Sequence, residues 1–296
     1  TLRDLIRHEV GRLIRQLFEV SGAPPNELRR VVLVGNTVMH HLFCGIDLTP
    51  LAHYPFEPVE NGLQVIRPQE LDWHVPPDTL VQFLPCLGSF VGSDVLAGVL
   101  ATGVHRPGRL DMLVDLGTNG EIVLSDGNRL LCASTAAGPA FEGARISAGM
   151  RAATGAIWKV AARDGHLHCE VLGNAEPRGI CGSGLVDAVA VGLDIGAVRP
   201  TGRLAVGDPW PLAGSVAITQ NDIRQLQLAK GAIAAGIRLI LEQWGATFDD
   251  VGHLYLAGAF GNYVDRTSAR RIGLLQMPLE KVKPAGNTAL QGAKIA

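Results

Sequence analysis

Hydrophobic side chains recur at helical spacing in two long segments of the chain. Over residues 2–18, apolar positions return every three or four residues, and the same spacing runs through residues 223–244. This period is typical of amphipathic helices. The first helix is predicted to end near Ser21-Gly22, because Pro24-Pro25 cannot continue it. Thr219 and Asp222 resemble a capping box, with Asp in place of Glu, at the start of the second.

Short, continuous apolar runs predict strands that are buried on both faces. Val31–Val34 is such a run, Val251–Leu256 is expected to form another buried strand, and a glycine turn follows each of them. Further strands are expected near residues 110–116, 120–125 and 129–133, and helices after the glycine-rich turns at 88–94 and 179–184. Residues 45–80 are rich in proline and have no clear period, so we expect irregular structure with short strands.

The order strand, glycine turn, helix occurs on both sides of Arg106 and suggests two related halves. A break in the pattern at residues 105–108 marks the boundary. The expected organisation is therefore α/β, with residues 1–106 forming part of a first domain and residues 107–296 a second. The helical pattern starts at once after Thr1, and residues 289–296 resemble a helix without a cap, so we expect the chain to be a piece of a longer protein.

Composition narrows the functional classes. The chain has 296 residues, 47% hydrophobic content, 36 glycines and a formal net charge of -2, which suits a well-packed α/β protein and does not imply a nucleic-acid partner. No apolar run reaches the length of a membrane span, and no signal peptide is expected. The five cysteines form no C-x-x-C pair. We therefore expect reduced thiols in the cytoplasm rather than a zinc or iron–sulfur site within this sequence.

The candidate chemistry centres on residues 113–124, where two apolar segments flank Gly117-Thr118-Asn119-Gly120. This pattern predicts a hairpin. Its glycines leave backbone amides uncovered, and with the Thr118 hydroxyl they suit a phosphate. Asp115 could hold the hydrated Mg²⁺ that accompanies phosphate. An ordinary Asn-Gly hairpin explains the same residues equally well.

Other candidates each have a plain structural alternative. Gly258, Ala259 and Gly261 follow a buried strand, where nucleotide contact competes with simple strand–helix packing. Asp94 could orient water or the Mg²⁺ hydration shell, or merely serve a helix dipole. Weaker nucleotide candidates are Gly182 and Ser183 before a helix, Lys230 within the long helix, and Glu142 near a ribose. The pair His40-His41 lacks a third metal ligand, so a partly buried helix face is the better account.

Five segments in order carry a family resemblance: Val34–His41, Asp115–Glu121, Ala136–Gly143, Gly179–Gly184 and Ala257–Gly261. The chain resembles the actin, sugar-kinase and heat-shock-chaperone ATPase superfamily. More closely, it resembles the C-terminal domain of the ATP-dependent reductive activators of corrinoid proteins. The resemblance implies an actin-like ATPase fold, with two related α/β domains whose mixed sheets surround a nucleotide cleft. The first of these domains would be incomplete in this sequence.

The resemblance also implies a function. Asp115–Glu121 corresponds to the second phosphate loop, Ala257–Gly261 to the adenosine loop, and Gly92-Ser93-Asp94 to the step with the catalytic carboxylate. ATP with Mg²⁺, held by Asp115 and Asp94, would drive reduction of a Co(II) corrinoid to Co(I) in a methyltransferase system.

The partners would be a corrinoid protein and an electron donor that acts through a ferredoxin-like 2Fe–2S domain outside this sequence, with a homodimer as the assembly. Residues 1–30 lack the first phosphate loop, so Asp115 would belong to half of a phosphate clamp. Two alternatives stay open: a small-metabolite kinase of the same fold, and a non-catalytic interaction module.

Overall fold

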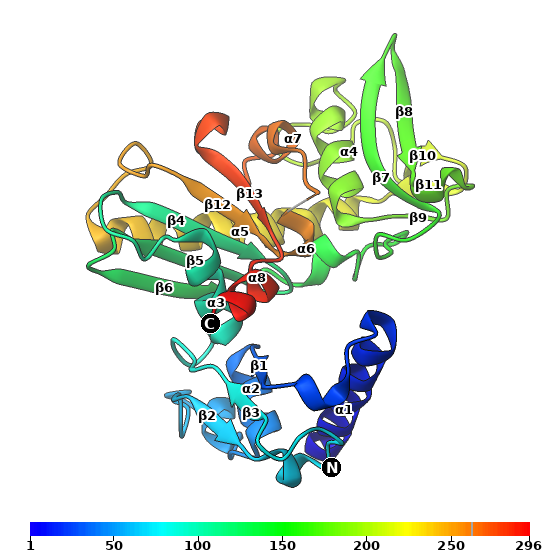
Figure 1. Ribbon diagram of the computed structural model, residues 1–296. Coiled ribbons are helices and arrows are strands. Elements are labelled where there is room, and N and C mark those ends of the chain that lie inside the picture. The colour runs from blue at the N-terminus through cyan, green and yellow to red at the C-terminus, as the bar shows by residue number, and fades with distance from the viewer. Residues whose placement is uncertain (262) are drawn as a thin grey trace. The chain divides into compact units, whose positions relative to one another are not determined.

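The computed structural model describes residues 1–261 and 263–296, with only the backbone of Ala259 (Figure 1). The chain forms two compact units. Unit 1 comprises Thr1–Gly103 together with Thr288–Ala296, and unit 2 comprises Val104–Asn287. These units differ from the expected domains, 1–106 and 107–296, mainly in assigning the last residues of the chain to unit 1. The domain assignment itself stays a prediction.

Unit 1 is built on a three-stranded sheet in the order β1-β3-β2. Strand β1 (Arg30–Leu33) is parallel to β3 (Leu80–Phe83), and β2 (Gln64–Ile66) is antiparallel to β3. The helices are α1 (Leu2–Ser21), α2 (Thr37–Cys44), α3 (Ser93–Thr102) and α8 (Thr288–Ile295). Helix α8 packs on α3, and a Cβ on Gly292 would lie 1.8 Å from the Ala97 carbonyl oxygen. This close contact explains why the C-terminal residues belong to unit 1.

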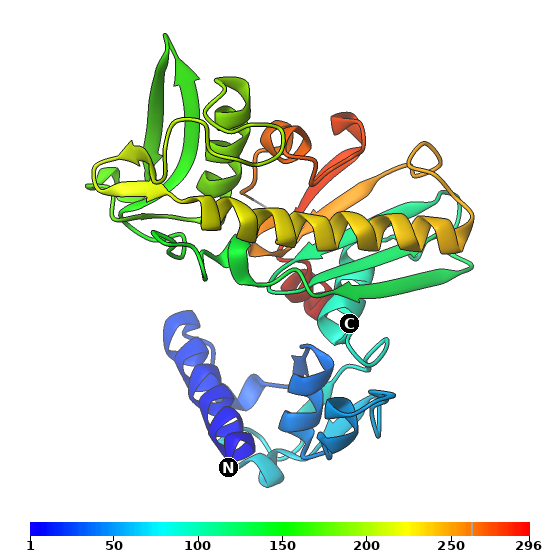
Figure 2. The ribbon, with the colours of Figure 1, turned by 180° about the vertical axis from the view of Figure 1, so that it is seen from behind.

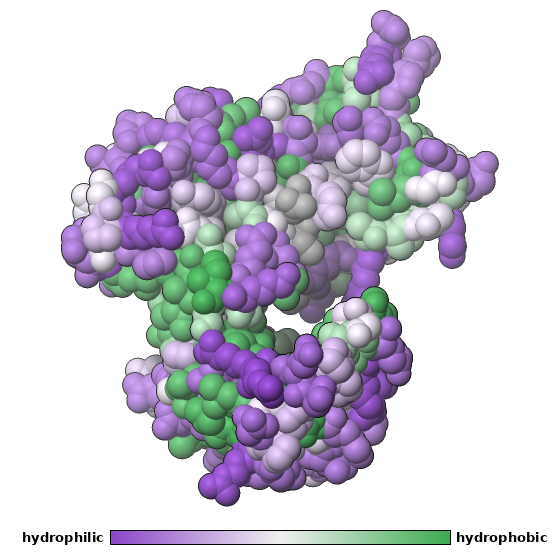
Figure 3. All heavy atoms as spheres, in the orientation of Figure 1, coloured by the Kyte–Doolittle hydropathy of each residue, from purple (hydrophilic) through white to green (hydrophobic). Residues whose placement is uncertain are grey.

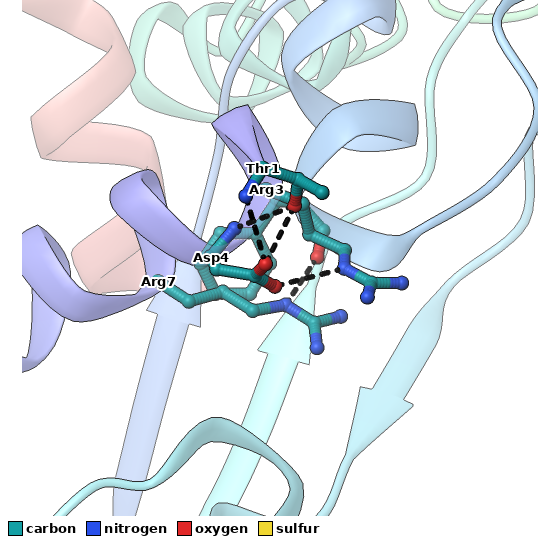
Figure 4. A network of polar contacts seen from close by, with 5 residues as sticks. Thr1, Arg3, Asp4 and Arg7 are labelled. Atoms are coloured by element: carbon teal, nitrogen blue, oxygen red, sulfur yellow. Dashed lines mark hydrogen bonds and ion pairs between the residues drawn. The ribbon is translucent and has the colours of Figure 1, made fainter.

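Helix α1 begins and ends where the sequence predicted. Thr1 and Asp4 form a complete capping box, and Gly22 ends the helix in the left-handed conformation. Figure 4 shows Asp4 between Thr1 and Arg3, and the neighbouring Arg7 whose Nε donates to the Phe43 carbonyl oxygen at 2.7 Å. The predicted irregular segment 45–80 contains β2 and the short 3₁₀ turns Thr49–Ala52 and Pro68–Leu71.

Unit 2 contains a mixed five-stranded sheet in the order β13-β12-β4-β5-β6. The first three strands are mutually parallel, whereas β4, β5 and β6 form an antiparallel meander. The bounds are β4 (Asp111–Leu116), β5 (Gly120–Ser125), β6 (Leu130–Thr135), β12 (Leu254–Ala257) and β13 (Val282–Gly286). The predicted strands at 110–116, 120–125 and 129–133 are thus confirmed.

Helix α5 (Gln220–Trp244) lies across the β5–β6 side of this sheet (Figure 2). Its buried residues Ile233 and Ile237 contribute to the main hydrophobic core together with Ile122 and Leu124 of β5. Gly236 allows the close approach, since a Cβ there would lie 2.3 Å from Cγ2 of Thr135. The long helix predicted from residues 219–244 is confirmed.

The strands of a second part of unit 2 were not predicted from the sequence, whereas the helix expected after residues 179–184 is observed. Strand β7 (Ala156–Arg163) pairs with β8 (His166–Val171) and β9 (Gly179–Ile180), next to α4 (Gly182–Asp194). The β7–β8 hairpin projects from the unit, and its tip is hydrophilic (Figures 1 and 3). The remaining elements are the hairpin β10 (Trp210–Ala213) and β11 (Val216–Ile218), and helices α6 (Gly258–Gly261) and α7 (Arg266–Arg271).

Candidate functional site

Segments that are far apart in the sequence meet around a cavity of about 520 Å³ in unit 2. The β4 end supplies Asp115 and Gly117, the start of α4 supplies Gly182 and Ser183, and the end of β12 is followed by Gly258. The described lining residues are completed by Leu116, Phe141, Glu142, Met150, Arg151, Ala152, Cys181, Phe260 and Tyr263. A volume of this size lies within the ordinary range for small-molecule sites, about 300–1,000 Å³.

The turn between β4 and β5 is tight and tied to a neighbouring loop. The Gly117 amide donates to the Asn119 carbonyl oxygen at 2.9 Å. The Thr118 hydroxyl donates to Oε1 of Glu142, on the loop that forms the 3₁₀ turn Pro139–Glu142, at 2.8 Å. Two sequence motifs that were singled out separately are therefore joined by one hydrogen bond.

Gly258 lies directly against the carboxylate of Asp115 at the end of β4. Ala257 of β12 stands opposite Asp115 of β4 in the parallel register. Gly258 has a φ of +87°, and a Cβ there would lie 2.6 Å from Oδ1 of Asp115 and 2.5 Å from the Leu116 carbonyl oxygen. Glycine meets both the left-handed backbone and the lack of space. The β12 turn and the β4 carboxylate thus form one surface.

The N-terminus of α4 opens on the same cavity. A Cβ on Gly182 would lie 1.9 Å from the Phe141 carbonyl oxygen, and one on Gly184 would lie 2.3 Å from that of Ile157. The Ser183 hydroxyl donates to the Trp158 carbonyl oxygen at 2.9 Å. Cys181 makes no side-chain capping bond to the described backbone. The first amides of this 13-residue helix therefore face the cavity with the positive end of its dipole.

The apolar lining comes from an aromatic pair. The rings of Phe141 and Phe260 are stacked, with centroids 4.4 Å apart and an interplanar angle of 21°. Both side chains are buried and line the cavity, whereas Tyr263 beside them is 63% exposed. This lining gives a flat, apolar ligand a surface to pack on.

The structure does not bring every predicted site residue to the cavity lining. Gly120 is buried in the sheet, where a Cβ would lie 2.8 Å from Cγ1 of Ile233, and Gly261 packs on Leu256. Lys230 donates from Nζ to the Ile272 carbonyl oxygen at 2.6 Å and lines a different, small cavity. Asn119 is exposed in the turn. The side chain of Ala259 lies outside the described residues.

Asp94 belongs to unit 1, at the start of α3. Its Oδ1 accepts from the Val95 amide at 2.9 Å, and burial raises the pKa of its carboxyl group. The preceding turn packs against the turn after β1, because a Cβ on Gly92 would lie 2.3 Å from the Gly35 carbonyl oxygen. Ser93 also bonds both backbone groups of Gly35 through its hydroxyl, at 3.1 Å each. The two glycine turns that the sequence singled out in unit 1 therefore form one packed element.

His40 and His41 in α2 are both 0% exposed, a deeper burial than the expected partly buried helix face. Nδ1 of His41 contacts the Thr37 carbonyl oxygen at 2.9 Å, and Nε2 of His40 contacts that of Gly62 at 3.2 Å. Burial lowers the pKa of His40. Over the described residues, no cluster of three or more His, Cys, Asp or Glu side chains is arranged to hold a metal ion.

Sequence reasoning missed the lining residues Met150, Arg151 and Tyr263. They lie in loops without glycine spacing or period, and only the charge of Arg151 could have drawn attention to them. In the part of the chain that the structure describes, no helix has the length and apolar character needed to cross a membrane.

Comparison with models of protein families establishes to which family the chain belongs. Residues 109–296 match the model described as the C-terminal domain of RACo, the ASKHA domain, and residues 1–107 match the RACo middle region. The chain belongs to the RACo family. The expected actin-like ATPase fold and the resemblance to corrinoid-protein activators are thereby confirmed. An ASKHA domain is a nucleotide-binding domain, which agrees with the cavity lined by Asp115 and Gly258.

Individual relatives of this RACo family chain agree. It is 33% identical to the corrinoid activation enzyme RamQ of Eubacterium limosum, covering 99% of this chain and 54% of that protein. It is 30% identical to a [Co(II) methylated amine-specific corrinoid protein] reductase of Methanosarcina barkeri, over 99% of this chain and 60% of that one.

A solved reductive activator for corrinoid, iron-sulfur protein superposes with a TM-score of 0.86 at 32% identity, over 99% of this chain and 50% of its own. The chain thus spans between half and three fifths of the length of these relatives.

Proposed function

We propose that the cavity of unit 2 binds ATP with Mg²⁺, and that the chain is the ATP-binding part of an activator that drives reduction of a Co(II) corrinoid to Co(I). The observation that carries the proposal is the meeting of Asp115, Gly182 and Gly258 around one cavity. A carboxylate, a helix N-terminus and a glycine turn are three groups that a metal-bound nucleotide requires.

The residues present fit Mg²⁺. This ion usually keeps several waters and takes one or two carboxylates together with phosphate oxygens. Asp115 and Glu142 both line the cavity. Asp115 stands beside the Gly117 turn at the end of β4, where the phosphates are proposed to bind, so it is the first candidate metal-shell residue.

The phosphates and the base have separate candidate surfaces. We assign the phosphates to the amides around Gly117 and Gly182, together with the Thr118 hydroxyl, and the base to the aromatic lining beside Gly258. The wider candidate nucleotide set from the sequence is Asp115, Gly117, Thr118, Asn119, Gly120, Gly182, Ser183, Lys230, Gly258, Ala259 and Gly261. Asp94, in unit 1, stays the candidate catalytic carboxylate and metal ligand that the sequence suggests, and burial raises the pKa of its carboxyl group.

The proposed activity needs parts beyond this sequence. An electron donor would deliver one electron through a ferredoxin-like 2Fe–2S domain, and a corrinoid protein in the cytoplasm would receive it. ATP can drive this transfer only if the nucleotide binds unequally to conformers that hold the corrinoid protein differently. A homodimer is the proposed assembly.

The test uses the full-length protein that contains this chain. ATP hydrolysis is measured with and without an oxidised corrinoid protein, and Co(I) formation is followed by its absorption spectrum. Stimulation of hydrolysis together with Co(I) formation supports the proposal. Phosphate transfer to a sugar or an acid would show a kinase instead, and absence of nucleotide binding would show an interaction module.

Substitution of Asp115 tests the cavity itself. Asp115→Ala is expected to weaken Mg-ATP binding by about 100-fold, the effect of losing a ligand worth about 2.7 kcal/mol, while the fold is retained. The matched control is Asp249→Ala, which removes the same charge from an exposed loop. Unchanged ATP turnover in Asp115→Ala would refute the phosphate-loop assignment.

A further inference from the structure

A second polar cavity lies in unit 2, between the turn at residues 199–203 and the first turns of α5. Its volume is about 540 Å³, and it is lined by Thr201, Gly202, Arg203, Gln220, Arg224 and Gln227. It shares no described lining residue with the cavity at Asp115. The proposed function uses none of these side chains.

The helix side of the cavity follows from helical spacing. Gln220, Arg224 and Gln227 stand at positions i, i+4 and i+7 of α5 and therefore lie on one face. Gln220 binds the turn twice, accepting from the Leu204 amide at 2.9 Å and donating to the Gly202 carbonyl oxygen at 2.8 Å. Gln227 donates to the Thr201 carbonyl oxygen at 3.2 Å. Arg224 lies between these two attachments.

The turn itself is held closed on the same helix face. The Gly202 amide donates to the Arg199 carbonyl oxygen at 2.7 Å, and the Arg199 amide donates to that of Arg203 at 2.8 Å. Gly202 has a φ of +83°, and a Cβ there would lie 2.2 Å from Nε2 of Gln227. The backbone of Arg203 is thus fixed against α5 by bonds on both sides.

This arrangement leaves two cations without a counter-ion. Within residues 1–261 and 263–296, the guanidinium groups of Arg203 and Arg224 have no hydrogen-bond or ion-pair partner, and no carboxylate is among the described lining residues. Two acidic side chains at the start of the helix accept hydrogen bonds from backbone amides. Asp208 accepts from the Gln220 amide at 3.1 Å, and Asp222 accepts from the amides of Thr219 and Ser147.

We propose that this cavity binds a small anion bearing phosphate or carboxylate groups through Arg203 and Arg224. Arg203 and Arg224 are exposed side chains that line one cavity, and an oxyanion between them would accept charge-assisted hydrogen bonds from both. Gln220 lies in the first turn of α5, so the helix dipole adds to the attraction. The volume exceeds that needed for a single carboxylate and suits a small polyanion.

The test is titration of the chain with inorganic pyrophosphate, followed by calorimetry and by the NMR signals of the arginine Nε–H groups. The double variant Arg203→Gln/Arg224→Gln is expected to bind at least about tenfold more weakly, since it loses charge-assisted bonds. Arg163→Gln, at the β7–β8 tip, removes the same kind of charge elsewhere and is expected to bind like the unaltered chain. Binding is also expected to weaken with added salt.

Several outcomes separate the proposal from its failure. Pyrophosphate that shifts the Nε–H signals of both arginines supports it. Signals that stay in place while pyrophosphate binds at the Gly117 and Gly182 amides would refute it, as would a double variant that titrates like the unaltered chain. Citrate in place of pyrophosphate distinguishes a carboxylate ligand from a phosphate ligand. ATP binding, measured separately on the same variants, is expected to be unchanged, so the two proposals fail independently.

Discussion

Helices α1 and α5 share the same local signals and differ in almost everything else. Each begins with a Thr-x-x-Asp capping box in which both hydrogen bonds are formed, and each ends at a left-handed glycine, Gly22 or Gly245. Yet α5 buries a continuous stripe from Ile223 to Leu241, whereas the buried residues of α1 are Gly11 and Ile14. Helices with the same capping signals therefore contribute very different amounts of buried apolar surface to the free energy of folding.

The two capping aspartates show what the difference teaches. Asp222 is 0% exposed and accepts from the amide and hydroxyl of Ser147 as well as from the Thr219 amide. Asp4 is exposed, and the Thr1 hydroxyl is the main cause that lowers its pKa to about 2. A capping box determines where a helix starts, but tertiary packing determines how much the capped helix contributes to the stability of the fold. In unit 2 the cap also anchors a loop.

The largest expected effect comes from the buried stripe. Leu241→Ala, at a side chain that is 3% exposed, is expected to lower the free energy of unfolding by about 3 kcal/mol, because it leaves a cavity in the core. Leu17→Ala in α1, at 67% exposure, is expected to change it by less than about 0.5 kcal/mol. Urea unfolding measures both. Equal losses at the two positions would contradict the contrast.

The next effect concerns the cap. Asp222→Ala leaves the Ser147 and Thr219 donors without their acceptor and is expected to lower the free energy of unfolding by about 2–3 kcal/mol. Asp4→Ala is expected to change it far less, because water replaces the lost bonds at an exposed site. Thermal melting of the two variants at pH 7 makes the comparison. A larger loss for Asp4→Ala would reverse our view of the two helices.

A third buried aspartate sharpens the contrast through pH. Asp187 in α4 is 4% exposed, and its Oδ1 has no hydrogen-bond partner among the residues that the structure describes. Burial raises its pKa from 3.8 to about 6. The folded chain therefore keeps a proton that the unfolded chain releases near pH 4. Between these values, rising pH lowers the free energy of unfolding, by about 3 kcal/mol in all once pH passes 6.

Asp187→Asn removes this dependence. We expect its unfolding free energy to vary less between pH 4 and 7 than that of the unaltered chain, and to be higher at pH 7. Urea unfolding across this pH range measures the difference. If the two pH curves run parallel, the buried carboxyl group is not the cause.

The smallest effect has opposite signs in the two helices. No described atom lies within 4 Å of a Cβ placed on Gly231 of α5, so Gly231→Ala is expected to raise the unfolding free energy by about 0.5–1 kcal/mol through helix propensity. A Cβ on Gly11 of α1 would lie 2.7 Å from Cδ1 of Trp73. Gly11→Ala is therefore expected to lower it by about 1 kcal/mol or more. Thermal melting of both variants shows whether each substitution raises or lowers stability. Stabilisation by both would show that the Trp73 side chain moves aside at little cost.

Much of this fold could be predicted because its strongest signals are local. The spacing of apolar residues, together with the proline and glycine residues that end helices and strands, predicted the two long helices and strands β4, β5 and β6 within a residue or two of their observed bounds. The motifs at Asp115, Gly182 and Gly258 do meet at one cavity, since glycine turns at strand and helix ends gather at a common edge of the sheet.

What could not be predicted depends on distant packing. Nothing local indicates that α8 packs on α3, or that Tyr263 and Arg151 reach the cavity. The β7–β8 hairpin was within reach of sequence reasoning. Asp164-Gly165 is a two-residue turn signal, and both residues adopt positive φ, 51° and 79°. The placing of Lys230 with nucleotide candidates used its charge alone, and its bond to the Ile272 carbonyl oxygen depends on tertiary structure.

The pairing of Ala257 with Asp115 has a consequence for how the protein is made. The parallel register joins two strands that lie far apart along the chain, with the β7–β8 hairpin and α4 between them. Contacts of such long sequence separation form late in folding. A chain that is still growing on the ribosome has its hairpin carboxylate early, but it has no complete cavity until the residues of β12 have been synthesised.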